Sequence, residues 1–260
     1  MLCRLCKQEK PLLKQSHIIP DFMYANLFDE HHKLHMFAPA QYLEGNRRVA
    51  RPASGEYEAD LLCQNCDNVV IGRYETYGRR ALYAGTNESQ DYPVLEHGVT
   101  ETGVPVTRIT DLDYRAFKLF LLSILWRASI STRPFFCSVH LGPYEEQIRR
   151  MVFEGDPGRF DDFPILLISW HADDSVPHDF VGQPNINRAT RGIRYIFPVV
   201  GISYIFHVSP NSVVPELLPF TLYPSNVGSI LYVPTGLGKE LFASYFNIKT
   251  SKQPFRATKL

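Results

Sequence analysis

The sequence predicts an α+β protein that combines a small zinc-centred ββα unit with a following α+β domain. Three observations support this class: two Cys-x-x-Cys pairs in the first part of the chain, one almost wholly apolar helical stretch, and several short β-rich runs after it. We expect the second domain to have two main helices packed on a mostly antiparallel sheet. The predicted boundaries are residues 1–90 for the zinc unit, 91–110 for a linker and 111–260 for the second domain.

The first unit is organised around four cysteines, Cys3 with Cys6 and Cys63 with Cys66. Four thiolates form a complete tetrahedral ligand set for one structural Zn²⁺. A redox dithiol and a pair of disulfides are the alternatives. A thioredoxin-like dithiol needs a strand before it, but hardly any chain precedes Cys3, and two such motifs in one small unit would be redundant. We therefore favour zinc.

A histidine lies between the two pairs, in the segment Ser-His-Ile-Ile-Pro at positions 16–20, and the second pair reads Leu-Cys-Gln-Asn-Cys-Asp. This order and spacing resembles the HNH nuclease superfamily in its zinc-containing, treble-clef form. Members of that superfamily carry Cys-x-x-Cys, then an acidic residue before His-Ile-Ile-Pro, then Leu-Cys-x-x-Cys followed by His or Asn. The resemblance covers roughly residues 1–82 and does not extend to the rest of the chain.

The resemblance implies that His17 is the general base for a water that attacks a phosphodiester. It also implies that Asp67, directly after the second pair, binds a catalytic Mg²⁺ or Mn²⁺. The chain departs from the family pattern at Ser16, where an acidic ligand is usual, and at Asp67, where His or Asn is usual. The central asparagine has no clear counterpart, although Glu58 or Asp60 lies near its place. Either the carboxylates have redistributed around the metal or the site is inactive.

Each site residue has a structural alternative. His17 can be a packed residue or a further zinc ligand, and Asp67 can be a helix N-cap. Glu56, Glu58 and Asp60 alternate along a predicted strand, so the three acids share a face that can approach a divalent ion. His31, His32 and His35 are assigned to a polar loop rather than to a second metal site.

The function that the resemblance implies is a metal-dependent endonuclease acting on DNA, as an effector of prokaryotic restriction or antiphage defence. A double-strand break from one active site per chain suggests a homodimer. The second domain would then bind a partner protein or an activating ligand. The alternative comes from another functional class: a catalytically inactive zinc module that binds nucleic acid or a protein partner.

The overall charge neither supports nor excludes nucleic acid, because Lys plus Arg and Asp plus Glu both number 27 in 260 residues. Phosphate contacts must therefore come from local clusters. Two groups of arginines are candidates, each with an ordinary solvated surface as its alternative: Arg47, Arg48 and Arg51 in the first unit, and Arg188 and Arg191 in the second domain.

Cysteine usage favours a reducing compartment, because four of the five cysteines lie in the two pairs. The remaining one, Cys137, is expected to be a buried, inert thiol. We find no signal peptide. The most apolar run, residues 117–126, is too short to span a bilayer. We therefore expect a cytoplasmic protein without a membrane partner.

The remaining elements are predicted from periodicity and turn residues. A short helix is expected at 21–28 and a longer one from Cys66 to Leu82. The second domain is expected to contain a buried helix at 113–131, a helix from 142 that ends at 156–158, a strand at 164–170, a hairpin at 194–208 that turns near Val200 and Gly201, and a strand at 230–233.

Overall fold

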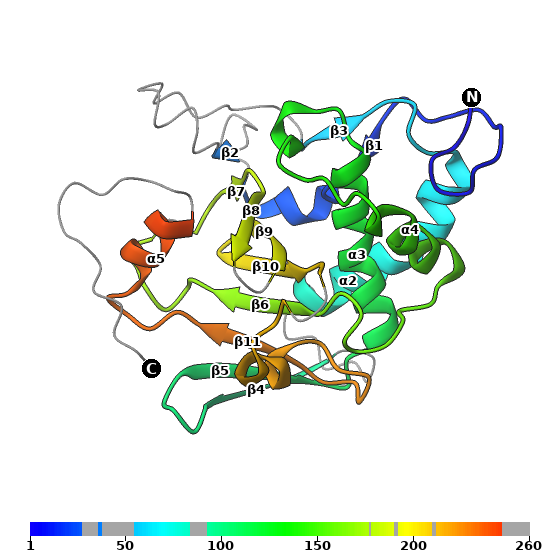
Figure 1. The fold of residues 1–260 in the computed structure, drawn as a ribbon. Coiled ribbons are helices and arrows are strands. Elements are labelled where there is room, and N and C mark those ends of the chain that lie inside the picture. Colours follow the sequence, from blue (N-terminus) through cyan, green and yellow to red (C-terminus); the bar gives the residue numbers. More distant parts are fainter. Residues whose placement is uncertain are drawn as a thin grey trace.

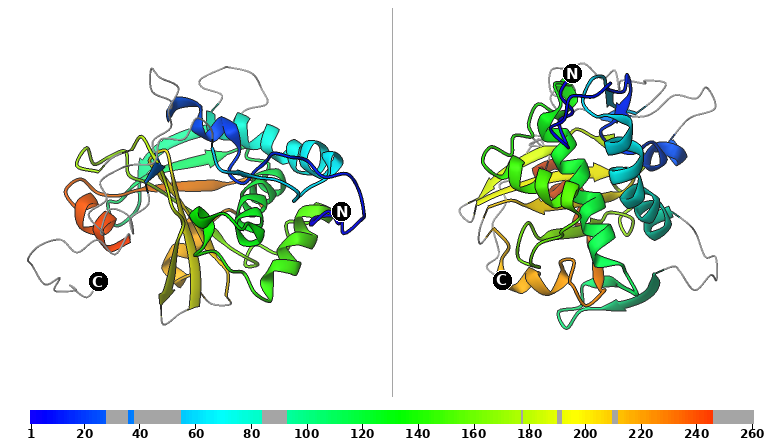
Figure 2. Two further views of the ribbon diagram at one scale, coloured as in Figure 1. Left: turned by 90° about the horizontal axis from the view of Figure 1, so that it is seen from above. Right: turned by 90° about the vertical axis from the view of Figure 1, so that its right-hand side faces the viewer.

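The computed structural model describes residues 1–27, 36–37, 55–83, 93–176, 178–189, 192–209 and 212–245. The fold is α+β, as predicted (Figure 1). A large mixed sheet lies beside three helices: α2 (Gly72–Tyr83), α3 (Tyr114–Ile130) and α4 (Tyr144–Glu154). Figure 2 shows that α5 (Gly238–Tyr245) lies at the end of the molecule opposite these three helices. No helix in the described ranges is both long enough and apolar enough to cross a bilayer.

The first unit contains β1 (Ser16–His17), which pairs antiparallel with β3 (Tyr57–Glu58). The predicted short helix is the 3₁₀ helix η1 (Asp21–Leu27). The second cysteine pair leads into η2 (Asn65–Ile71), a π-helix that continues as α2, and the N–H of Gly72 donates to the Asp67 carbonyl. The helix predicted after Cys66 is therefore confirmed, with a wider first section than an α-helix has.

Helix α3 is buried on nearly every side, as its apolar composition predicts. Its N-cap is Asp113, whose Oδ1 accepts a hydrogen bond of 2.9 Å from the Ala116 N–H. The helix ends at Ser131, which is extended. It packs against α2 and α4. Helix α4 ends at Gly155, whose left-handed conformation lets its N–H bond the Met151 carbonyl.

The large sheet has the strand order β2-β7-β9-β10-β6-β11-β5-β4, and β8 also pairs with β9. Only the β11–β6 and β2–β7 pairings among the described strands are parallel, so the sheet is mostly antiparallel, as predicted. The strands are β2 (Met36–Phe37), β4 (Val94–Val99), β5 (Pro105–Thr110), β6 (Ile165–Ser169), β7 (Val181–Gly182), β8 (Asn185–Ala189), β9 (Gly192–Val199), β10 (Ile202–His207) and β11 (Gly228–Tyr232).

The predicted hairpin is formed by β9 and β10. Its turn residues Val200 and Gly201 both have positive φ. By contrast, the expected linker at 91–110 contains β4 and β5, an antiparallel pair at one edge of the sheet. Every residue of β4 is exposed, so no alternation of apolar and polar residues marked it as a strand. That part of the domain assignment is corrected.

The two faces of the sheet have different partners. Alternate residues such as Leu167, Phe197 and Phe206 belong to the same core as α3, whereas Leu166, Ile196 and Ile205 pack on the other face, against the 3₁₀ helix η4 (Pro215–Phe220) among others. The larger core also includes Cys3, Ile18 and Leu62. The first unit and the rest of the chain therefore share one hydrophobic core.

Candidate metal centre

The four paired cysteines converge in space. The sulfur atoms of Cys3, Cys6, Cys63 and Cys66 all lie within 4.8 Å of one another, and all four are free thiols. Zn–S bonds of about 2.3 Å in a tetrahedron place sulfurs about 3.8 Å apart, which is within this limit. Cys3, Cys63 and Cys66 are buried and Cys6 is half-buried. The donor set therefore suits a closed, structural metal site, for which zinc is the expected ion.

Backbone hydrogen bonds hold the two cysteine pairs together. The Leu13 N–H bonds the Leu62 carbonyl at 2.8 Å, the Arg4 N–H bonds the Leu61 carbonyl at 3.0 Å, and the Cys63 N–H donates to Cys3 Sγ at 3.4 Å. The N–H of Cys63 donates to sulfur, and such a bond favours the thiolate over the thiol.

The thiols differ in acidity. Burial opposes ionisation of Cys3, but backbone N–H groups of Cys6, Cys63 and Leu5 outweigh it and lower its pKa to about 7. Burial and the neighbouring thiols raise the pKa of Cys66. Four thiolates cannot be held together without a cation, so metal binding at this centre releases protons.

Asp67 lies within electrostatic range of His17. Burial raises the pKa of Asp67 and is the largest effect on it, whereas the charge of His17 is a smaller effect that lowers this pKa. Arg127 also lowers it, whereas Glu75 raises it. Asp67 lies three residues inside η2, whose N-cap is Gln64, so Asp67 is not the N-cap. His17 Nε2 lies 3.9 Å from Asp21 Oδ1, and a third of its side chain is exposed.

Ser16, the residue before His17, is fully buried. Its hydroxyl lies against the Asp67 carboxylate and favours the ionised form, yet Ser16 Oγ has no hydrogen-bond partner of standard geometry within the described part of the chain. A polar atom buried in this way is costly. The position would accept an additional partner.

Sequence reasoning missed Arg127 and Glu75, which support this region from α3 and α2. Arg127 is 1% exposed. Its Nη1 donates to the His17 carbonyl and its Nη2 lies 2.7 Å from Glu75 Oε1. A signal was present, because a cation inside an otherwise apolar helix needs a buried anion or carbonyl partner.

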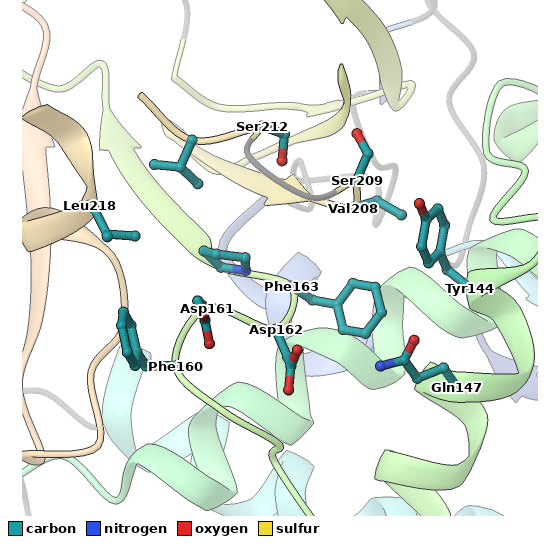
Figure 3. A pocket seen from close by; sticks show the side chains of 12 residues that line it. Tyr144, Gln147, Phe160, Asp161, Asp162, Phe163, Val208, Ser209, Ser212 and Leu218 are labelled. Carbon is teal, nitrogen blue, oxygen red and sulfur yellow. The ribbon is translucent and has the colours of Figure 1, made fainter. Parts of the chain in front are cut away.

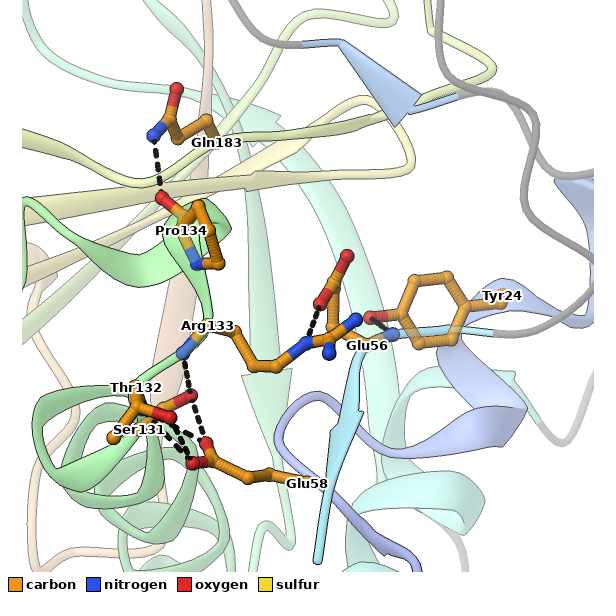
Figure 4. Close-up of polar contacts among 8 residues, drawn as sticks. All are labelled: Tyr24, Glu56, Glu58, Ser131, Thr132, Arg133, Pro134 and Gln183. Atoms are coloured by element: carbon orange, nitrogen blue, oxygen red, sulfur yellow. Dashed lines mark hydrogen bonds and ion pairs between the residues drawn. The ribbon is translucent and has the colours of Figure 1, made fainter.

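Glu58, a candidate metal ligand, has other partners in this structure. Its carboxylate accepts hydrogen bonds from Ser131 Oγ and from the N–H and Oγ1 of Thr132, so it fastens the end of α3 (Figure 4). Glu56 pairs with Arg133 at 3.0 Å. The strand that was expected to align the acids is only two residues long.

Asp60 also has a partner of its own. It has a positive φ of 60° and pairs with Lys14 at 3.6 Å. Among the described residues, the four cysteines are the one group of three or more His, Cys, Asp or Glu side chains arranged to hold a metal. Neither Glu58 nor Asp60 belongs to that group.

The other predicted positions fall outside this centre. Arg188 is exposed on β8. Cys137 is exposed rather than buried, because it follows the short 3₁₀ turn η3 (Pro134–Phe136) at the surface, where Gln183 Nε2 donates to its sulfur at 3.5 Å. Arg47, Arg48, Arg51, Arg191, His31, His32 and His35 lie outside the described residues.

A separate hollow of about 400 Å³ lies between the 160–164 loop and the residues after β10 (Figure 3). Its two acids are already engaged, because Asp161 pairs with Arg159 at 2.9 Å and Asp162 accepts from the Arg159 N–H. This hollow therefore adds no unpaired carboxylate to the candidate site.

Comparison with known proteins finds no match: no family model, curated protein or solved structure is significantly similar to this chain.

Proposed function

We propose that this chain is a metal-dependent HNH-like endonuclease that hydrolyses phosphodiester bonds of DNA. The main support is that Arg127 joins the two segments. Its guanidinium bonds the His17 carbonyl and pairs with Glu75 on α2, the helix that continues η2 with Asp67, so His17 and Asp67 lie within electrostatic range although they are far apart in the sequence. They lie in the unit whose two ends meet at the four-thiol centre. Together with the resemblance in motif order, this favours a nuclease over a zinc module without chemistry.

In this proposal the residues have separate roles. Zinc on the four thiolates is structural and holds the segments that carry β1 and η2 together. The His17 imidazole takes a proton from water while the water oxygen bonds to phosphorus and the bond from phosphorus to the leaving sugar oxygen breaks. Mg²⁺ or Mn²⁺ bound by Asp67 would supply stabilisation of the negative charge on the phosphate and the leaving oxygen.

The surroundings of His17 suit this role. Its backbone is held by Arg127, while its ring remains one-third exposed and reachable by substrate. Asp21 Oδ1 lies 3.9 Å from His17 Nε2, so its carboxylate is placed to orient the ring. Asp21 is therefore an additional positioning residue in the proposal.

The test is cleavage of supercoiled plasmid by the full-length, zinc-loaded chain in Mg²⁺ or Mn²⁺. We expect wild type to nick DNA, and His17→Ala and Asp67→Ala to lose at least about a hundredfold in rate, the usual contribution of a general base. Zinc content and melting temperature should not change. Matched controls are His140→Ala and Asp174→Ala, which alter exposed residues outside this centre.

A catalytically inactive zinc module is the second candidate, favoured by Ser16 in place of an acid and by the engagement of Glu58. If wild type and both variants bind one zinc and DNA but none cleaves it in either metal, the inactive module replaces the nuclease. If controls and site variants lose activity alike, the assignment of His17 and Asp67 is wrong.

The biological setting proposed here rests on the resemblance alone. It is a prokaryotic restriction or antiphage effector that acts in the cytoplasm, where thiols stay reduced. A homodimer would place two sites on one duplex, and a ligand or partner protein of the second domain would control cleavage.

A further inference from the structure

A hollow of about 400 Å³ lies between α2 and the start of α3, outside the candidate metal centre. These helices pack side by side (Figure 1). Three guanidinium groups line it, those of Arg73, Arg80 and Arg115, and all three residues are exposed. The single carboxylate in its lining belongs to Asp113, which caps α3 through the Ala116 N–H. The hollow is therefore a concentration of positive charge in a chain whose net charge is zero.

These arginines differ from the others in their partners. In the described part of the chain, none of the three has a carboxylate within ion-pair distance, whereas five other arginines do: Arg127, Arg133, Arg149, Arg150 and Arg159. Unpaired guanidinium groups that share a hollow repel one another. An anion in the hollow would remove that repulsion.

The backbone brings two of these groups together at Gly155. Arg115 Nε donates to the Gly155 carbonyl at 2.6 Å, which holds the guanidinium in place. A Cβ at Gly155 would lie 2.9 Å from one Arg115 Nη2 and 3.0 Å from Arg73 Nη2. Gly155 has a φ of 75°, so glycine is favoured there by conformation as well as by space.

Helix geometry aligns the remaining groups. Arg73, Tyr77 and Arg80 are spaced i, i+4 and i+7 on α2 and therefore share one face. Seven helical residues rise roughly 10 Å, a length comparable with about three nucleotide steps along one DNA strand. The N-terminus of α3 adds its positive end to the same hollow.

We propose that this hollow, the arginine groove of Arg73, Arg80 and Arg115, binds the phosphate backbone of duplex DNA. Guanidinium groups bind phosphate oxygens in a bidentate manner, and such contacts position DNA without reading its sequence. The choice of DNA over other anions rests on the proposed nuclease function. The groove is an interaction surface separate from His17 and Asp67.

The test measures binding of a short fluorescent duplex to the full-length, zinc-loaded chain without Mg²⁺ or Mn²⁺, across a range of salt concentrations. The variants are Arg80→Gln and the double variant Arg73→Gln/Arg80→Gln. Arg79→Gln is the matched control, because Arg79 is exposed on the same helix but does not line the groove. Melting temperature confirms folding of each variant, and Arg80 has no intramolecular ion pair with any described residue to lose.

We expect each lost phosphate contact to reduce the slope of log affinity against log salt by about 0.9, so by about 1.8 in the double variant. Affinity at low salt should fall by roughly tenfold or more, whereas Arg79→Gln should behave as wild type. Equal slopes for wild type and the double variant, or no duplex binding by wild type, would overturn the proposal. The proposal would also be overturned if inorganic phosphate or polyglutamate, at matched ionic strength, displaced the fluorescent duplex as well as unlabelled duplex does.

The outcome is separable from that of the nuclease proposal. If His17→Ala abolishes cleavage but keeps the wild-type salt slope, both proposals stand. If wild type never cleaves but the groove variants lose duplex binding, the groove stands and the nuclease fails. If groove variants bind and cleave like wild type while His17→Ala does not cleave, the groove fails and the nuclease stands.

Discussion

The guanidinium of Arg127 on α3 donates a hydrogen bond of 2.7 Å to the backbone carbonyl oxygen of His17 on β1. The same side chain lies 2.7 Å from Glu75 on α2, and its Nε bonds the Ser123 carbonyl. One buried cation therefore joins the candidate site to the helical core. The position of His17 depends on a residue far along the chain.

Replacing this cation should be strongly destabilising. In Arg127→Met we expect the free energy of unfolding to fall by about 3 kcal/mol or more, because Glu75 and the His17 carbonyl lose their partner in a poorly solvated site. Denaturant unfolding measures the change. Arg150→Met, which removes the exposed pair with Glu154, should cost less than about 1 kcal/mol.

A companion variant identifies the cause. In Arg127→Met/Glu75→Gln the unpaired carboxylate is gone, so part of the lost stability should return. The single variant Glu75→Gln is the reference. If adding Glu75→Gln to Arg127→Met lowers the free energy of unfolding by as much as it does in wild type, the two side chains are not coupled.

Loss of one cysteine of the four-thiol centre should remove zinc and unfold the first unit. We expect one zinc per wild-type chain and none in Cys66→Ser, with a lower melting temperature, because structural zinc contributes roughly 10 kcal/mol or more in small zinc domains. Zinc affinity should also fall as pH decreases, because protons compete for the thiolates. Metal analysis and thermal denaturation provide the readouts.

Cys137→Ser is the matched control, since Cys137 lies outside the centre. Full zinc content in Cys66→Ser would contradict a four-thiolate site.

Placing an acid before His17 tests whether Asp67 faces a cation site. In Ser16→Asp a second carboxylate is placed against Asp67, so without a divalent ion the chain should lose roughly 1–2 kcal/mol by charge repulsion and burial. Mn²⁺ should then raise its melting temperature more than that of wild type, because binding to the folded state stabilises it.

The asparagine in Ser16→Asn has nearly the same volume as the aspartate in Ser16→Asp but no charge. This variant should therefore not gain the response to Mn²⁺. An equal effect of Mn²⁺ on the Asp and Asn variants would show that no cation binds between positions 16 and 67.

His207 should make the chain sensitive to mild acid. It is 1% exposed, and burial lowers its pKa to about 4, with a further decrease from Arg194. The unfolded histidine titrates near 6.5, so between about pH 6.5 and 4 the unfolded state binds a proton that the folded state does not. The free energy of unfolding therefore has its full value above about pH 6.5 and is lower by about 3 kcal/mol at pH 4.

In His207→Gln this loss should disappear, which melting temperatures measured from pH 7 to pH 4 would reveal. His140→Gln, at an exposed position, should keep the wild-type dependence. A parallel fall in wild type and His207→Gln would assign the acid sensitivity to other groups.

Local patterns predicted much of the fold because their signals lie within one segment. The apolar run of α3 has no polar face to expose, and its burial follows from composition alone. The β9–β10 hairpin is marked by β-rich runs on both sides of a turn. The β4–β5 pair was missed because an edge strand exposed on both sides has no alternating pattern.

The sequence by itself determined the candidate metal centre, because two Cys-x-x-Cys pairs supply four thiols whose ligand chemistry is specific. Only the tertiary structure decided which partners the charged side chains have. Glu58 was a candidate ligand by position, yet it fastens α3, while Arg127 and Glu75 became neighbours of His17 and Asp67. An ionisable side chain can pair with any partner that folding brings within a few ångströms, and spacing along the chain does not encode that partner.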